Sequence, residues 1–231
     1  DSSDLSVSSF SGTLADAAGG AAAATGTVDL GAVIVDANTP DITGCDATDA
    51  AYGVGEAISI TCTYNEAVTV TGTPTITLSN SDVASYASGS GSTDIVFTTT
   101  VAEGDTDSAD LSVSSIAPTA GGATMKDGNA NAVSTTITGG DLGAVTVDGD
   151  APDFSSVAAT DGAYGVGETL SITVTWGEAV VVTGTPTLTL SNSDTASYVS
   201  GSGSTALVFT TQIAENDATS SDLSVSSFSG T

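Results

Sequence analysis

The stretch ISITCTY, residues Ile58–Tyr64, places a large or apolar side chain at every second position, with serine or threonine between them. A period of two is the mark of a strand with one buried face. The same alternation recurs in LSITVTW, Leu170–Trp176, and in shorter runs at residues 76–78, 95–101, 111–113 and 145–147. Turn signals rich in glycine and proline separate these runs. The chain is therefore predicted to consist of short strands joined by tight turns.

The sequence also contains an internal repeat. Residues 49–119 and 161–231 align without a gap, and 50 of these 71 positions carry the same residue. Where inward strand positions differ, the exchanged side chains are similar in size, as in Tyr64 and Trp176, and a core tolerates such exchanges at small cost. A period of about 110 residues indicates an array of similar domains. Seven to eight strands per unit favour a Greek-key immunoglobulin-like β-sandwich, and the predicted fold class is all-β.

The repeat predicts the domain boundaries. Residues 37–148 are expected to form a complete unit, and residues 149–231 the N-terminal part of the next one. Residues 1–36 are expected to be the C-terminal strands of a preceding unit, because Asp29–Gly31 matches Asp141–Gly143. Each terminal piece lacks strands that would close its core, so neither is expected to be stable alone.

Two interpretations of this arrangement remain open. Residues 1–13 recur, with one change, as residues 219–231, so residues 149–231 and 1–36 together amount to one whole unit when the shared segment is counted once. The chain is then either a segment of a longer array, or a subunit whose two ends complete one domain between neighbouring molecules.

The strongly acidic composition of the chain limits which partners it can bind and which reactions it can catalyse. The chain has 28 acidic residues, one cationic side chain (Lys126) and no histidine, which gives a net charge of −27. Nucleic acid and anionic membranes are excluded as partners, because binding to their phosphates requires lysine and arginine. No apolar run is long enough to insert into a membrane. Without histidine, Ser–His–Asp and Cys–His arrangements cannot form, and we expect no enzymatic activity.

Several short motifs carry a family resemblance. They are Pro40-Asp41, YGVGE (Tyr52–Glu56), ISIT (Ile58–Thr61), EAVTV (Glu66–Val70), GTP (Gly72–Pro74), ASY (Ala84–Tyr86) and GSG (Gly89–Gly91). Their combined order resembles the tandem bacterial immunoglobulin-like repeats of giant secreted adhesins and surface filament proteins. The resemblance implies extender domains in a long extracellular chain at the cell surface, often stiffened by calcium. The chain lacks the glycine-aspartate nonapeptide repeat of type I secretion, which leaves the secretion route open.

Loop acids form the first candidate metal site. In a sandwich of this strand order, three loops of the complete unit meet at one pole, and Ca²⁺ takes about six to eight oxygen ligands. The candidate ligands there are Glu56, Glu103, Asp105, Asp148, Asp150 and Asp153. Their equivalents are Glu168, Glu215 and Asp217 in the second copy, with Asp36 and Asp41 at the first linker. The hypothesis is that Ca²⁺ stiffens the junction between units. The alternative is that these are solvated loop acids that keep a secreted chain soluble.

A second candidate is DGNAN, Asp127–Asn131, which resembles the start of an EF-hand loop with oxygens at its first, third and fifth positions. The glycine and glutamate that should follow are replaced by Ala132 and Thr138. The stretch is therefore interpreted as an Asx-rich turn.

The two cysteines lie in the complete unit at positions where the second copy has apolar residues. Cys45 aligns with Val157, and Cys62 aligns with Val174. Their joint appearance on neighbouring strands predicts a disulfide, which would stabilise the unit by about 3 kcal/mol. It also implies an oxidising compartment. The alternative is a pair of free buried thiols that act as small apolar residues.

The sequence therefore predicts a structural segment of an extracellular repeat array, an adhesin stalk or surface filament, with Ca²⁺ at the junctions between repeats. Its partners would be neighbouring repeats or copies of itself. One alternative is a self-assembling filament subunit whose ends complete a shared domain by strand addition. A second alternative is a carbohydrate- or protein-binding module, which would require an exposed patch that the copies do not share.

Overall fold

The computed structural model describes residues 6–7, 12, 14–21 and 28–229; the remainder of the predicted terminal piece 1–36 lies outside the described residues. The chain divides into two units, residues 1–150 (unit 1) and residues 151–231 (unit 2). In the described ranges, the secondary structure consists of strands and a single 3-10 turn, η1, at Ala120–Gly122.

Unit 1 contains an antiparallel sheet of seven strands in the order β10-β5-β8-β7-β6-β9, with β3 also paired to β5. Its strands are β3 (Ile42–Ala47), β5 (Ala57–Thr71), β6 (Thr75–Leu78), β7 (Val83–Ser88), β8 (Ser92–Thr100), β9 (Val113–Ala117) and β10 (Thr124–Lys126). Two short pairs complete the unit: β4 (Ala51–Tyr52) runs parallel to β11 (Thr146–Val147), and β1 (Ser6–Val7) is antiparallel to β2 (Val28–Asp29).

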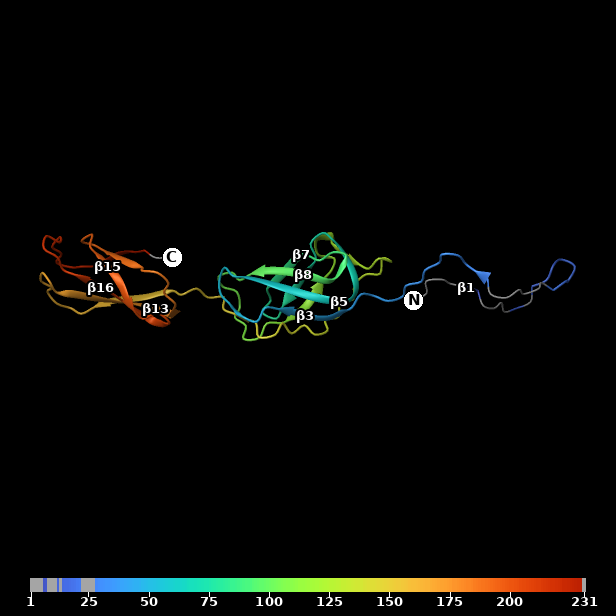
Figure 1. Ribbon diagram of the computed structural model, residues 1–231, viewed down its shortest axis with the longest axis horizontal. Helices are drawn as coiled ribbons and strands as arrows, with labels where there is room; N and C mark the ends of the chain where they lie inside the picture. Colours follow the sequence, from blue (N-terminus) through green and yellow to red (C-terminus); the bar gives the residue numbers. More distant parts are fainter. Residues whose placement is uncertain (1–5, 8–11, 13, 22–27, 230–231) are drawn as a thin grey trace. The chain divides into compact units, whose positions relative to one another are not determined.

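The long strand β5 organises unit 1 (Figure 1). Its first part pairs with β3 and its last residues, Thr69–Thr71, pair with β10. The alternation read from the sequence is present in the structure: Ile58, Ile60, Cys62 and Tyr64 are all buried, and the residues between them face outward. A single apolar core of 23 buried residues forms behind this strand.

Unit 2 repeats six of these strands in the order β12-β13-β16-β15-β14-β17, which corresponds to β3-β5-β8-β7-β6-β9 of unit 1; its described residues contain no counterpart of β10. They are β12 (Phe154–Ala159), β13 (Thr169–Val180), β14 (Thr187–Leu190), β15 (Thr195–Ser200), β16 (Ser204–Gln212) and β17 (Val225–Ser229). Each begins 112 residues after its counterpart in unit 1, as Phe154 follows Ile42. The core of unit 2 has only eight buried residues.

The architecture is all-β, with two curled antiparallel sheets consistent with a β-sandwich, as the alternation predicts. In the part of the chain that the structure describes, no helix has the length and apolar character needed to cross a membrane.

Cys45 and Cys62, the pair that the sequence predicts to be joined, form a disulfide between β3 and β5. They are register partners, and their Cα atoms lie 4.0 Å apart. The Cys45 N–H donates to the Gly139 carbonyl (2.8 Å) and not across to Cys62. The cysteines therefore occupy a non-hydrogen-bonded pair of the ladder, where opposite Cα atoms lie closest.

Candidate metal centre

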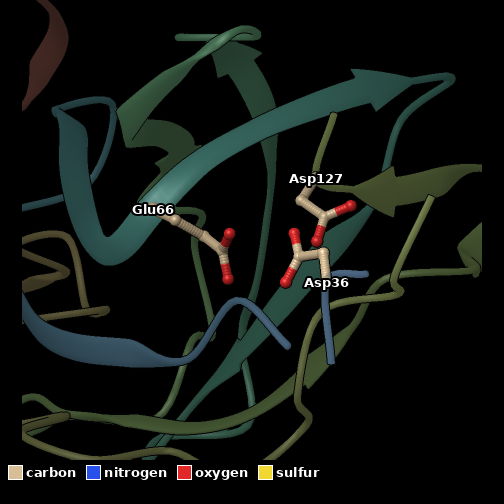
Figure 2. Close-up of side chains that lie close together, drawn as sticks. All are labelled: Asp36, Glu66 and Asp127. Carbon is tan, nitrogen blue, oxygen red and sulfur yellow. The ribbon is translucent and has the colours of Figure 1, made fainter. Parts of the chain in front are cut away.

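The carboxylates of three residues that are distant in sequence lie close together in unit 1 (Figure 2). These residues are Asp36, Glu66 and Asp127. One oxygen of each lies within 4.8 Å of the others. Asp36 stands in the linker before β3, Glu66 on β5, and Asp127 directly after β10. The pairing of β10 with the end of β5 brings Asp127 to this position.

Glu66 occupies an inward position of β5. The inward residues Tyr64 and Val68 on either side of it are buried, so a carboxylate interrupts the apolar face of the strand. The pairing of β5 with β8 shifts register between Thr63 and Val68, which places Glu66 at a bulge or irregularity of the ladder. Bulges redirect side chains and are frequent beside functional sites. The side chain is half-buried, its Oε1 is shielded from solvent, and no donor in the described residues reaches that oxygen.

Asp127 is buried and holds a tight turn. Its Oδ1 accepts the backbone N–H groups of Asn129 (2.8 Å) and Asn131 (2.9 Å), and its Oδ2 accepts the Asn131 amide (2.8 Å). Ala130 completes the turn with a φ of 73°. This is the Asx-rich turn read from the sequence, and the same carboxylate also faces Glu66 and Asp36.

Asp36 is tied to the same turn. Its Oδ2 accepts the side-chain amide of Asn129 (2.6 Å), its carbonyl accepts that of Asn131 (3.3 Å), and its Oδ1 accepts the N–H of Asn38 (3.1 Å). The hydrogen bonds from Asn129 and Asn38 stabilise the ionised form and lower the pKa of Asp36. These hydrogen bonds hold the Asp36 carboxylate in place beside the turn.

The charges around Glu66 all have the same sign. Burial raises the pKa of the Glu66 carboxyl, and the negative charges of Asp127, Asp36 and Asp41 raise it further. A divalent cation at this point would reverse that effect, because its positive charge favours the ionised carboxylates. Carboxylate oxygens without nitrogen or sulfur ligands suit the hard cations Ca²⁺ and Mg²⁺.

The loops predicted to share a pole do lie together in unit 1. The Gly104 N–H donates to the Gly149 carbonyl (2.9 Å), the Gly149 N–H donates to Asp107 Oδ1 (2.9 Å), and the Gly55 N–H donates to the Val101 carbonyl (2.8 Å). The convergence of loops follows from the strand order.

The carboxylates of these loops are mostly used as acceptors within their own turns. Glu56 accepts the N–H of Gly53, Asp105 that of Ala102, and Asp148 that of Asp150. Glu168 and Asp217 do the same in unit 2, toward Gly165 and Ala214. Glu103, Asp150, Asp153, Glu215 and Asp41 are exposed. In the residues that the structure describes, none of these acids joins a group of three carboxylates as close as Asp36, Glu66 and Asp127.

Of the three clustered acids, the sequence predicts Asp36 as a ligand and misses Glu66 and Asp127. Glu66 could have been found because it places a charged residue at an inward position of the alternating sequence of β5. Glu178 occupies the same position in the second copy. The signal for Asp127 is the DGNAN motif, which resembles the start of an EF-hand loop and for which the sequence favours an Asx-rich turn over a metal site.

Comparison with known proteins adds no assignment. The sequence matches none of the protein-family models, and no curated protein matches it.

Proposed function

We propose that this chain is a structural segment of an extracellular array of immunoglobulin-like repeats, an adhesin stalk or surface filament, and that Ca²⁺ bound by Asp36, Glu66 and Asp127 stiffens it. The repeated sequence and the matching strands of the two units support the array. The disulfide supports an oxidising, extracellular setting. The strongly acidic composition suits a cation-binding chain without nucleic-acid or membrane partners.

The observation that carries the cation is the convergence of three carboxylates, one of which has a shielded oxygen that no donor in the described residues reaches. Three carboxylates supply up to six oxygens, and the amides of Asn129 and Asn131 already point at the cluster. A half-turn of either amide would present its oxygen in place of its NH₂ group. This donor set matches the ligand number and ligand type of Ca²⁺.

The mechanical consequence follows from where Asp36 stands. It belongs to the linker, six residues before the start of β3 at Ile42. A cation shared with Glu66 and Asp127 would bind this linker to β5 and to the turn after β10. The linker would then lose its freedom to bend, which is the effect that an extender needs.

The test is a thermal melt of the chelator-stripped chain with and without Ca²⁺. At a Ca²⁺ concentration about 100 times Kd, binding adds about 2.7 kcal/mol to the stability of unit 1. For a unit of this size, that raises Tm by about 10 °C. Glu66→Gln should abolish the rise, and isothermal titration should lose the binding heat.

Glu178→Gln is the matched control, because it removes one charge from the corresponding position of β13. It should leave the response of unit 1 unchanged. A melting temperature that ignores both Ca²⁺ and chelator refutes the metal site. If the response is lost in Glu56→Gln and kept in Glu66→Gln, Ca²⁺ is bound at the pole of unit 1.

A further inference from the structure

Asp36 is bound to the turn after β10 by two side-chain amides. The Asn129 amide donates to Asp36 Oδ2 (2.6 Å), and the Asn131 amide donates to the Asp36 carbonyl oxygen (3.3 Å). The Asn131 amide also donates to Asp127 Oδ2 (2.8 Å), so it joins the linker to the turn. A carboxylate and a carbonyl oxygen only accept hydrogen bonds, so the NH₂ group of each amide is the group that faces Asp36.

The turn itself does not depend on these amides, because a similar turn at Asp16 forms without them. Asp16 Oδ1 accepts the N–H groups of the residues two and four positions on, which are Ala18 (2.9 Å) and Gly20 (2.8 Å). Asp127 Oδ1 accepts the N–H groups at the same two positions of its own turn, at 2.8 Å and 2.9 Å. The aspartate therefore plays the same part in both turns.

The backbones of the two turns also agree. The aspartate at the start of each turn donates its N–H to the carbonyl four residues on, at 2.9 Å in the turn at Asp16 and at 3.0 Å in the turn at Asp127. The fourth residue of each turn has a positive φ, which is 84° for Gly19 and 73° for Ala130. The backbone conformation is therefore retained when the side chains around it change.

The two turns differ at their third and fifth residues. Where the turn after β10 has Asn129 and Asn131, the turn at Asp16 has Ala18 and Gly20, which carry no side-chain donor. The amides are therefore not required to form the turn, and their hydrogen bonds to the linker serve another purpose.

We propose that Asn129 and Asn131 form a latch, which holds the linker at Asp36 against unit 1 before any cation binds. The bond from Asn129 ends on a carboxylate, and such charge-assisted bonds are about twice as strong as neutral ones. The far end of the linker is held separately, because the Asp41 N–H donates to Asn65 Oδ1 (2.9 Å) and the Asn65 N–H donates to the Asp41 carbonyl (3.0 Å). The linker is thus fixed at both ends in the cation-free protein.

The latch also prepares the cation site, a consequence that rests on the proposed Ca²⁺ centre. An entering cation finds Asp36 already beside Asp127 (Figure 2), so its binding does not have to order the linker first. The two amides can then turn over and offer their oxygens in place of their NH₂ groups. The shared cation replaces the latch, and the linker stays fixed in both states. Asn129 and Asn131 are thus positioning residues, and they keep the linker stiff when Ca²⁺ is scarce.

Backbone order parameters from ¹⁵N relaxation, measured on the 231-residue chain with chelator present, test the latch. Residues 36–38 of the wild type should be as rigid as the strands, with values of about 0.85. In Asn129→Ala/Asn131→Gly, which copies the turn at Asp16, these values should fall below about 0.6. Asp41 should keep its wild-type value because Asn65 still holds it, and β5 should keep its values because unit 1 remains folded.

Asn129→Asp is a second variant, because it replaces the donor by a carboxylate of nearly the same shape. With chelator present, the new charge repels Asp36, and residues 36–38 should become mobile. Ca²⁺ should restore their order, because a cation can join the two carboxylates. Asn192→Asp is the matched control: it makes the same exchange in a turn of unit 2, where Asn192 Oδ1 accepts the Asp194 N–H (3.2 Å), and it should leave the linker of unit 1 unchanged.

Two results would overturn the latch. One is a wild-type linker that is already mobile with chelator present, and the other is a linker that is as ordered in Asn129→Ala/Asn131→Gly as in the wild type. The Ca²⁺ titration separates this proposal from the metal centre. If Ca²⁺ neither binds the wild type nor orders the linker of Asn129→Asp, the metal centre fails, whereas the latch is decided by the measurements with chelator alone.

Discussion

Replacing the disulfide by the residues that unit 2 uses gives a prediction with a defined magnitude. In Cys45→Val/Cys62→Val, strands β3 and β5 receive the pair Val157 and Val174, which are register partners on β12 and β13. The exchange therefore removes the bridge and keeps apolar side chains of a kind this ladder accommodates. The bridge closes a loop with a sequence separation of 17, and restricting that loop in the unfolded chain is worth about 3 kcal/mol. For a unit of about 110 residues, this lowers Tm by about 12 °C.

Differential scanning calorimetry measures the effect, and Trp176 fluorescence serves as the internal control. Trp176 is the only tryptophan and lies in unit 2, so its transition should not move. Dithiothreitol should lower the unit 1 transition of the wild type by the same amount and should leave the double variant unchanged. If the double variant melts within about 3 °C of the oxidised wild type, the loop-entropy argument fails.

Three further predictions concern single side chains. The folded state raises the pKa of Glu66 above its ordinary 4.5, so the calcium-free chain loses stability as pH rises from that value. Glu66→Gln should therefore be more stable than the wild type when both are unfolded in urea at neutral pH with chelator present. Equal stability of the two proteins would contradict this reasoning. Tyr64 is buried, its hydroxyl has no partner in the described residues, and burial raises its pKa. Tyr64→Phe should stabilise unit 1 by up to about 1 kcal/mol in the same assay. A clear loss of stability would instead reveal a partner for the hydroxyl. Gly89 has a φ of 103°, and a Cβ there would collide with the Asp94 carbonyl oxygen. Gly89→Ala should lower the free energy of unfolding of unit 1 by at least about 2 kcal/mol. The loss should be substantially larger than for Gly91→Ala, because Gly91 shares the positive φ but has open space around its Cβ position.

The strands could be read from the sequence because their evidence is local. The alternation in Ile58–Tyr64 corresponds to the buried face of β5, and the glycine-rich stretches fall between strands. The run at 145–147 was a weaker guide, since only Thr146–Val147 is strand there. That segment is held mainly by isolated bonds to loops on two sides, and such bonds leave no periodic signature.

The candidate metal centre was only partly predictable, because its members are distant in sequence. The position of Asp36 in the first linker predicts it as a ligand. Its meeting with Asp127 and Glu66 depends on β10 pairing with the far end of β5 and on the register shift around Glu66. No local pattern encodes a pairing register, and acidic residues are so frequent in this chain that composition alone could not single out these two.

The disulfide also limits how far the chain can be drawn out. Residues between Cys45 and Cys62 cannot contribute to extension under tension while the bridge is intact. Fully extended, about 17 residues span about 60 Å. Unit 2 has valines at the corresponding positions and carries no such restraint. A fibre of such units would therefore hold a reserve of length in its bridged members, released when they are reduced.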